Sequence, residues 1–78
     1  MSGRPVKHSL TLHGHRTSVS LEDEFWRAFR DIAASKSIPI NVLAAEIDAN
    51  RAPDTGLASA SRVYVLRHYQ DLSDQGPA

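Results

Sequence analysis

The stretch TSVSLEDEFWRAFRDIAASKSIPINVLAAEI, residues 17–47, decides the fold, because its hydrophobic period changes partway through. From Thr17 to Leu21, apolar or β-branched residues fall on every second position. From Phe25 onward they recur three and four residues apart, which is the spacing of one helix face. The stretch therefore predicts a strand that runs almost without a loop into an amphipathic helix.

The strand is expected at residues 15–21, and alternation places Val19 and Leu21 on its buried side. An earlier segment, KHSLTL at 7–12, alternates in the same way. The dipeptide HG between the two segments allows a turn, so they can pair in a hairpin. The polar side of the 15–21 strand carries Arg16, Ser18 and Ser20.

Helices are expected over residues 22–36, 39–51 and 57–72. Acidic residues crowd the first turn of the first helix, where the helix dipole favours them. Pro39 suits the first turn of the second helix. The third segment has an apolar centre, VYVL, that also allows a strand, but its uninterrupted length favours a helix. These elements supply the residues of the predicted dimer core: Val19, Leu21, Phe25, Phe29, Ile32, Leu43 and Ile47.

The chain has 78 residues, enough for one domain, expected at 7–72 between a flexible arm at 1–6 and a disordered tail at 73–78. So short a chain buries only about 60% of its unfolded surface and usually needs additional support. The sequence contains no cysteine, which excludes disulfides and cysteine-containing zinc sites. A partner chain is therefore the expected support.

Charge is distributed unevenly along the chain. Residues 1–18 contain three Lys or Arg and no acid, whereas the remaining residues carry a net charge of −3 within a total of zero. Such asymmetry suggests an anionic partner, although a short basic arm can also be simply solvated.

With these elements in this order, the chain resembles the ribbon-helix-helix family of bacterial DNA-binding proteins. SVSL followed by acidic residues and an aromatic resembles that family's strand-to-helix junction, and AASKSIPINVLAAEI resembles its inter-helix turn and second helix. The resemblance implies a mostly α-helical fold and an intertwined homodimer in which each chain gives one strand to an antiparallel ribbon. It also implies a cytoplasmic transcriptional regulator, such as a repressor, whose ribbon enters the major groove of double-stranded DNA.

The resemblance also implies roles for individual residues. Two positions depart from the family pattern: Ser37 replaces a common turn glycine, and Pro39 replaces a common serine and removes an N–H that could hold phosphate. The base-contacting positions would be Arg16, Ser18 and Ser20, and the phosphate-contacting ones Arg4, Lys7, His15 and Asn41.

Other interpretations remain open at this level. The polar strand face could be a solvated edge that nothing contacts. His8, His13 and His15 raise the possibility of a metal site, but surface histidines are favoured, and no metal or cofactor is expected. No nucleophile or phosphate-loop motif indicates an enzyme, and no apolar run suggests a membrane span or an export signal. The main alternative is a protein-binding module that uses residues 57–72.

Overall fold

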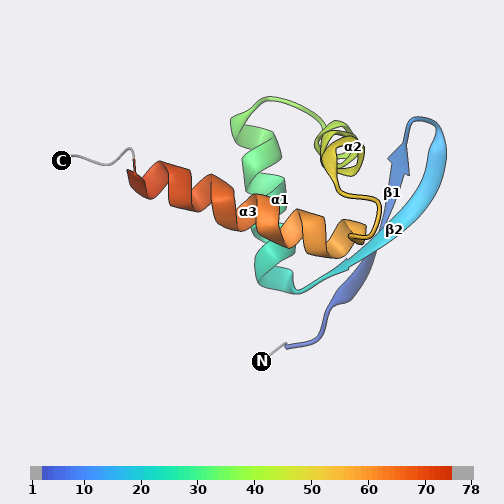
Figure 1. The fold of residues 1–78 in the computed structure, drawn as a ribbon, viewed down its shortest axis with the longest axis horizontal. Coiled ribbons are helices and arrows are strands. Elements are labelled where there is room, and N and C mark those ends of the chain that lie inside the picture. Colours follow the sequence, from blue (N-terminus) through green and yellow to red (C-terminus); the bar gives the residue numbers. More distant parts are fainter. Residues whose placement is uncertain (1–2, 75–78) are drawn as a thin grey trace.

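A computed structural model describes residues 3–74 as a β-hairpin with three helices on one of its faces (Figure 1). Every predicted element is present, within two residues of its expected bounds. Residues 1–2 of the predicted arm and 75–78 of the predicted tail lie outside the described residues. In chain order the elements are β1 (Val6–Leu12), β2 (His15–Leu21), α1 (Asp23–Ser35), α2 (Ile40–Asn50) and α3 (Leu57–Asp74).

The two strands form an antiparallel hairpin within one chain, and Leu12 lies opposite His15 next to the turn. The two connecting residues both have positive φ, 52° at His13 and 82° at Gly14. Positive φ at both central positions defines a type I′ turn, whose twist matches that of the flanking strands. The hairpin that the sequence allowed is therefore confirmed.

The first helix ends in a left-handed residue. The N–H of Ser37 donates to the carbonyl of Ala34 at 3.0 Å, and that of Ile38 donates to the carbonyl of Ala33 at 3.1 Å. This pair of bonds is a Schellman motif, which requires positive φ at the first residue beyond the helix cap. Ser37 has a φ of 57°, so the residue that replaces the usual glycine keeps the backbone conformation glycine would have.

The second helix begins one residue later than predicted. Pro39 has extended backbone angles and caps α2 rather than entering it. Its carbonyl accepts the first bonds of the helix, from the N–H groups of Val42 and Leu43. The N–H groups of Ile40 and Asn41 therefore belong to the free end of the helix.

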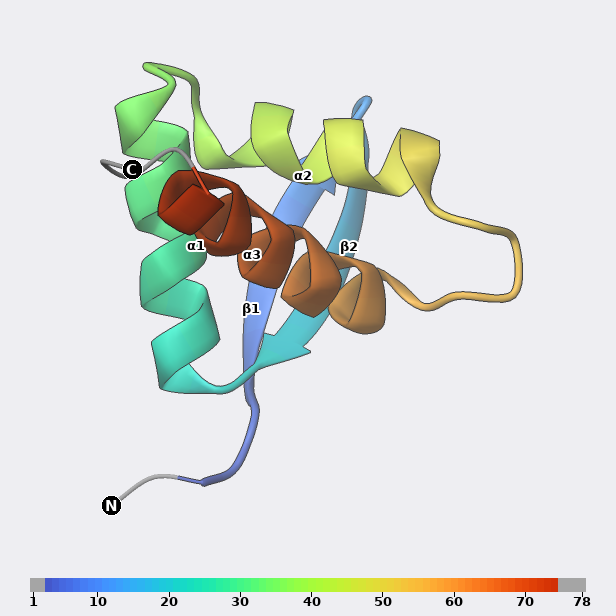
Figure 2. The same ribbon diagram turned by 60° about the vertical axis from the view of Figure 1, so that its left-hand side comes forward.

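The core lies between the hairpin and the three helices. Figure 2 shows the arrangement of these elements from a second side. Six of the seven predicted core residues are buried. The exception is Phe25, which is only partly buried because it lies at the edge of the core, with the Arg62 guanidinium 5.9 Å from its ring centre. The buried apolar residues of the core are Leu10, Leu12, Val19, Leu21, Phe29, Ile32, Ala33, Leu43, Ala44, Ile47 and Val65.

The C-terminal half of α3 extends past α1, away from the hairpin (Figure 1). Its large apolar side chains are consequently exposed: Leu66 by 54%, Tyr69 by 42% and Leu72 by 50%. The helix predicted for residues 57–72 is therefore confirmed, and the alternative of a strand at VYVL is wrong. Within residues 3–74, no helix is long and apolar enough to cross a bilayer.

Candidate nucleic-acid interface

The face of the hairpin that is turned away from the helices carries polar side chains on both strands. Residues directly opposite each other in an antiparallel pair lie on the same face of the sheet. All six side chains of this face are exposed. Three cross-strand pairs form it, and we term it the outer face: Lys7 with Ser20, Ser9 with Ser18, and Thr11 with Arg16.

The outer face is positively charged. Lys7 and Arg16 lie on different strands near opposite ends of the hairpin, roughly 13 Å apart along the strand direction at 3.3 Å per residue. None of the six side chains is a carboxylate. Arg4 adds a third exposed cation just before β1 begins. A strip of hydroxyl groups between two cations suits an anionic partner with hydrogen-bonding edges.

The structure places the three predicted base-contacting residues together. Arg16, Ser18 and Ser20 are exposed on the outer face because Val19 and Leu21, which alternate with them, are buried under the helices. The inward and outward assignment of β2 from the sequence is therefore confirmed. The side chains offer guanidinium donors and hydroxyl groups that can donate or accept.

The four predicted phosphate-contacting residues are not brought together. Lys7 belongs to β1 and shares the outer face with Arg16, whereas Arg4 precedes the strand. His15 alternates onto the other face, next to the turn and opposite Leu12. The Oδ1 of Asn41 accepts the backbone N–H of Thr11 at 3.1 Å, so this side chain binds the edge of β1.

Two outer-face residues, Ser9 and Thr11, were missed by the sequence reasoning. The signal was present, because Leu10 and Leu12 alternate with them and are only 3% and 7% exposed. Once β1 pairs with β2, that alternation fixes Ser9 and Thr11 on the outer face. The quoted resemblance covered residues 17–47, so Ser9 and Thr11 of β1 were assigned no role.

Comparison with known proteins extends the similarity to a known family beyond residues 17–47. The family model described as "Ribbon-helix-helix domain" matches residues 5–69, which include both strands and most of α3. The chain belongs to the ribbon-helix-helix family. Domains of this family generally bind DNA and are typically non-enzymatic. No curated protein and no solved structure matches the chain.

In this ribbon-helix-helix domain, Arg62 of α3 holds the junction between β2 and α1. Its Nε donates to Oε1 of Glu22 at 2.9 Å, and its Nη2 donates to the carbonyl of Ser20 at 3.4 Å. The hydrogen bond from Arg62 holds the pKa of Glu22 below its ordinary value. The contact attaches α3 to the end of the ribbon and orients the last residues of β2.

One histidine of the ribbon-helix-helix domain, His8, is engaged in an aromatic stack. His8 stacks on Trp26 of α1 with 3.8 Å between ring centres and 4° between ring planes. Its Nε2 is buried, with no hydrogen-bond partner in the part of the chain that the structure describes. Across residues 3–74, no three His, Asp or Glu side chains gather closely enough to hold a metal ion. The stack covers part of the Trp26 ring, which is partly buried against the core.

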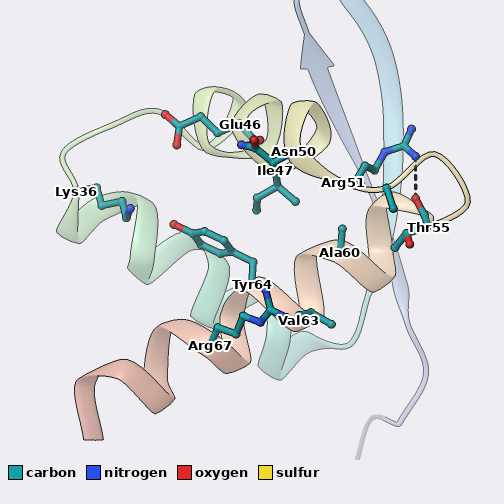
Figure 3. Close-up of a pocket in the computed structure, with 11 residues that line it drawn as sticks. Lys36, Glu46, Ile47, Asn50, Arg51, Thr55, Ala60, Val63, Tyr64 and Arg67 are labelled. Carbon is teal, nitrogen blue, oxygen red and sulfur yellow. Dashed lines mark hydrogen bonds between the residues drawn. The ribbon is translucent and has the colours of Figure 1, made fainter. Parts of the chain in front are cut away.

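A cavity of about 530 Å³ lies between α2 and α3, on the helical side of the molecule (Figure 3). Much of its polar lining is already engaged. The Nη1 of Arg51 donates to the carbonyl of Thr55 at 2.7 Å, and its Nε binds Asp48 at 2.7 Å. The Nζ of Lys36 lies 5.8 Å from the centre of the Tyr64 ring, and the neighbouring Tyr64 hydroxyl raises the pKa of the lysine. The polar side chains that line the cavity therefore largely contact other parts of the same chain.

Proposed function

We propose that this domain binds double-stranded DNA in a sequence-specific manner, with the outer face of the hairpin in the major groove. The observation that carries the proposal is a two-stranded ribbon with six exposed polar side chains and no acid. The major groove is about 12 Å wide and admits a two-stranded β-ribbon. Family membership supports the same partner.

Individual roles follow from side-chain chemistry. Arg16 has the geometry for a bidentate contact to guanine, and the hydroxyls of Ser18 and Ser20 can donate or accept at base edges. Lys7 and Arg4 supply positive charge for phosphate oxygens, which position the protein without reading sequence. The free N–H groups at the start of α2 offer a further anion site.

We further propose that the protein acts as a homodimeric transcriptional regulator, a repressor in the bacterial cytoplasm. The exposed apolar side chains of α3 support dimerisation, because Leu66, Tyr69 and Leu72 would lose water contact against a second copy. Sedimentation equilibrium at micromolar concentration tests the dimer. A folded monomer at that concentration would contradict it.

The test of DNA binding is fluorescence anisotropy with a random duplex pool at two salt concentrations, followed by selection of preferred sequences. Affinity should fall steeply with salt, since each phosphate contact releases counterions. Arg16→Ala should cost about 1–3 kcal/mol on the preferred sequence and relax the preference at one position. Arg30→Ala is the matched control, because Arg30 is an exposed arginine on α1, off the ribbon. Equal loss on every sequence would show that Arg16 acts only through its charge.

A second candidate function is protein binding through α3. The observation that favours it is the same exposed apolar surface, which includes Val63 at 45% and Leu66 at 54% exposure. Under this alternative, DNA binding would be weak and nearly independent of salt. Replacing Leu66 by Lys would abolish binding of the partner protein, whereas the Arg16→Ala variant would still bind it.

A further inference from the structure

We propose that the cavity between α2 and α3 is a binding site for a small organic anion, a carboxylate with an apolar or aromatic body. The carboxylate would lie against Lys36 and Arg67 at the rim, and the apolar body would lie on the side chains beneath them. The site is separate from the outer face of the hairpin, so it goes beyond the proposed DNA binding and does not depend on it.

Two helix faces build the cavity. Each helix contributes side chains that recur three or four positions apart and therefore share one side of that helix. These residues are Ala60, Val63, Tyr64 and Arg67 of α3, with Ile47 and Asn50 of α2. In Figure 3, Ile47 and Tyr64 are directed into the space between the two helices. The helical periodicity of both elements therefore aims side chains at the same space.

The side of α3 that lines the cavity differs from the side that carries its most exposed apolar residues. At 3.6 residues per turn, Leu66 and Tyr69 lie roughly 140° around the helix axis from the middle of the cavity-lining side. Neither residue lines the cavity. Dimerisation through Leu66 and Tyr69 therefore does not require that the cavity be covered.

The floor of the cavity is apolar and favours a ligand with an apolar body. Ile47 is only 6% exposed and belongs to the core, and Ala60 is partly buried against it. Val63 lines the same cavity and remains 45% exposed, so a ligand there would remove apolar surface from water. The ring of Tyr64 adds an aromatic wall on which a flat ring can pack. The volume of about 530 Å³ is typical of small-molecule sites, which span about 300–1,000 Å³.

The rim carries more positive than negative charge. Lys36 and Arg67 are both exposed, and Glu46 is the one acid among the lining residues that the structure describes. Arg51 adds no net charge, because its Nε binds the carboxylate of Asp48 at 2.7 Å. Two cations therefore face a single carboxylate, and the excess positive charge suits an anion.

Arg67 is the cation that is free to bind this anion. The charge of Lys36 is partly engaged, because the Tyr64 hydroxyl and, to a smaller extent, the Glu46 carboxylate raise the pKa of the lysine. Within residues 3–74, Arg67 makes no hydrogen bond or ion pair, not even with Asp71 four positions further along α3. A guanidinium offers a planar pair of N–H donors that matches a carboxylate. An unpaired guanidinium beside an apolar floor fits an amphipathic carboxylate better than a neutral molecule.

Titration with 2-naphthoate and 2-naphthamide tests the site without DNA. The two probes share one ring system and differ in charge. By calorimetry, 2-naphthoate should bind with a Kd of about 1 mM or below, as expected for a ligand of about 13 heavy atoms. The amide should bind roughly 10-fold more weakly, since it cannot form a charge-assisted pair. In two-dimensional NMR, the shifts caused by 2-naphthoate should concentrate at the backbone amides of Ile47, Ala60 and Tyr64.

Three variants separate the charge from the cavity itself. Arg67→Gln should weaken 2-naphthoate about 10-fold and leave 2-naphthamide unchanged. Arg30→Gln is the matched control, because Arg30 is an exposed arginine on α1 that does not line the cavity. Ala60→Leu places a larger side chain in the cavity and should abolish binding of both probes. Because Arg67 is exposed, its variant tests the site even if Ala60→Leu does not fold.

Three results would overturn the inference. If 2-naphthoate does not bind at 10 times the expected Kd of about 1 mM, or shifts only amides far from the cavity, there is no site between α2 and α3. If both probes bind equally well, the cavity does not select an anion. If Arg30→Gln weakens 2-naphthoate as much as Arg67→Gln does, the anion responds only to the net charge of the protein. DNA is absent from all of these measurements, so each failure leaves the proposed function of the outer face unaffected.

Discussion

Replacing Ser37 by glycine should stabilise the protein, although glycine inside a helix usually destabilises it. Ser37 has a φ of 57° as the residue after the cap of α1. A left-handed conformation costs an L-residue about 1–2 kcal/mol, and glycine avoids this cost. Glycine gains about 0.5–1 kcal/mol of backbone freedom in the unfolded chain, which offsets part of the benefit. The net gain in unfolding free energy should be about 0.5–1 kcal/mol.

Thermal unfolding followed by circular dichroism provides the assay. In a domain of this size, the gain corresponds to a rise in Tm of about 2–8 °C. Ser35→Gly is the matched control, because Ser35 is in the last turn of α1 and its hydroxyl donates to the carbonyl of Ile32 at 2.8 Å. That variant should lose about 0.5–1 kcal/mol. If Ser37→Gly lowers the Tm as Ser35→Gly does, Ser37 is not held in the left-handed region.

Three further predictions concern the core and the two contacts that join helices to the hairpin. Ile47→Ala should lower the unfolding free energy by about 2–5 kcal/mol in urea denaturation, because Ile47 is only 6% exposed; a loss below about 0.5 kcal/mol would place it on the surface. The lowered pKa of Glu22 gives stability that is present above about pH 4.3 and lost as pH falls through the folded value. Arg62→Gln should return that pKa toward its ordinary value in an NMR titration, and an unchanged titration would contradict the assignment. Asn41→Ala should speed hydrogen exchange of the Thr11 amide and cost at most about 1 kcal/mol; unaltered exchange would mean that Asn41 does not protect this edge.

Local patterns in the sequence were sufficient to predict the elements. The change of period after Leu21 located the junction between β2 and α1 within one residue. Alternation around Val19 predicted which side of β2 is buried. These features depend on residues close together in the chain, where side-chain direction follows directly from helix or strand geometry.

Contacts between distant residues could not be predicted in the same way. Asn41 and Thr11 are 30 residues apart, and only the packing of α2 beside β1 brings the amide side chain to the strand edge. The pairing of Arg62 with Glu22 depends likewise on how α3 crosses the junction. Phe25 followed the apolar stripe of its helix, but the stripe does not reveal where the core ends.

The origin of both strands in one chain has a consequence for how such a protein can diverge. In a ribbon assembled from two identical strands, every codon change alters the surface twice, at symmetry-related places. Here each outer-face residue occurs once per hairpin, so a change at Thr11 leaves Ser20 unaffected. The outer-face residues of β1 can therefore change by mutation independently of those of β2.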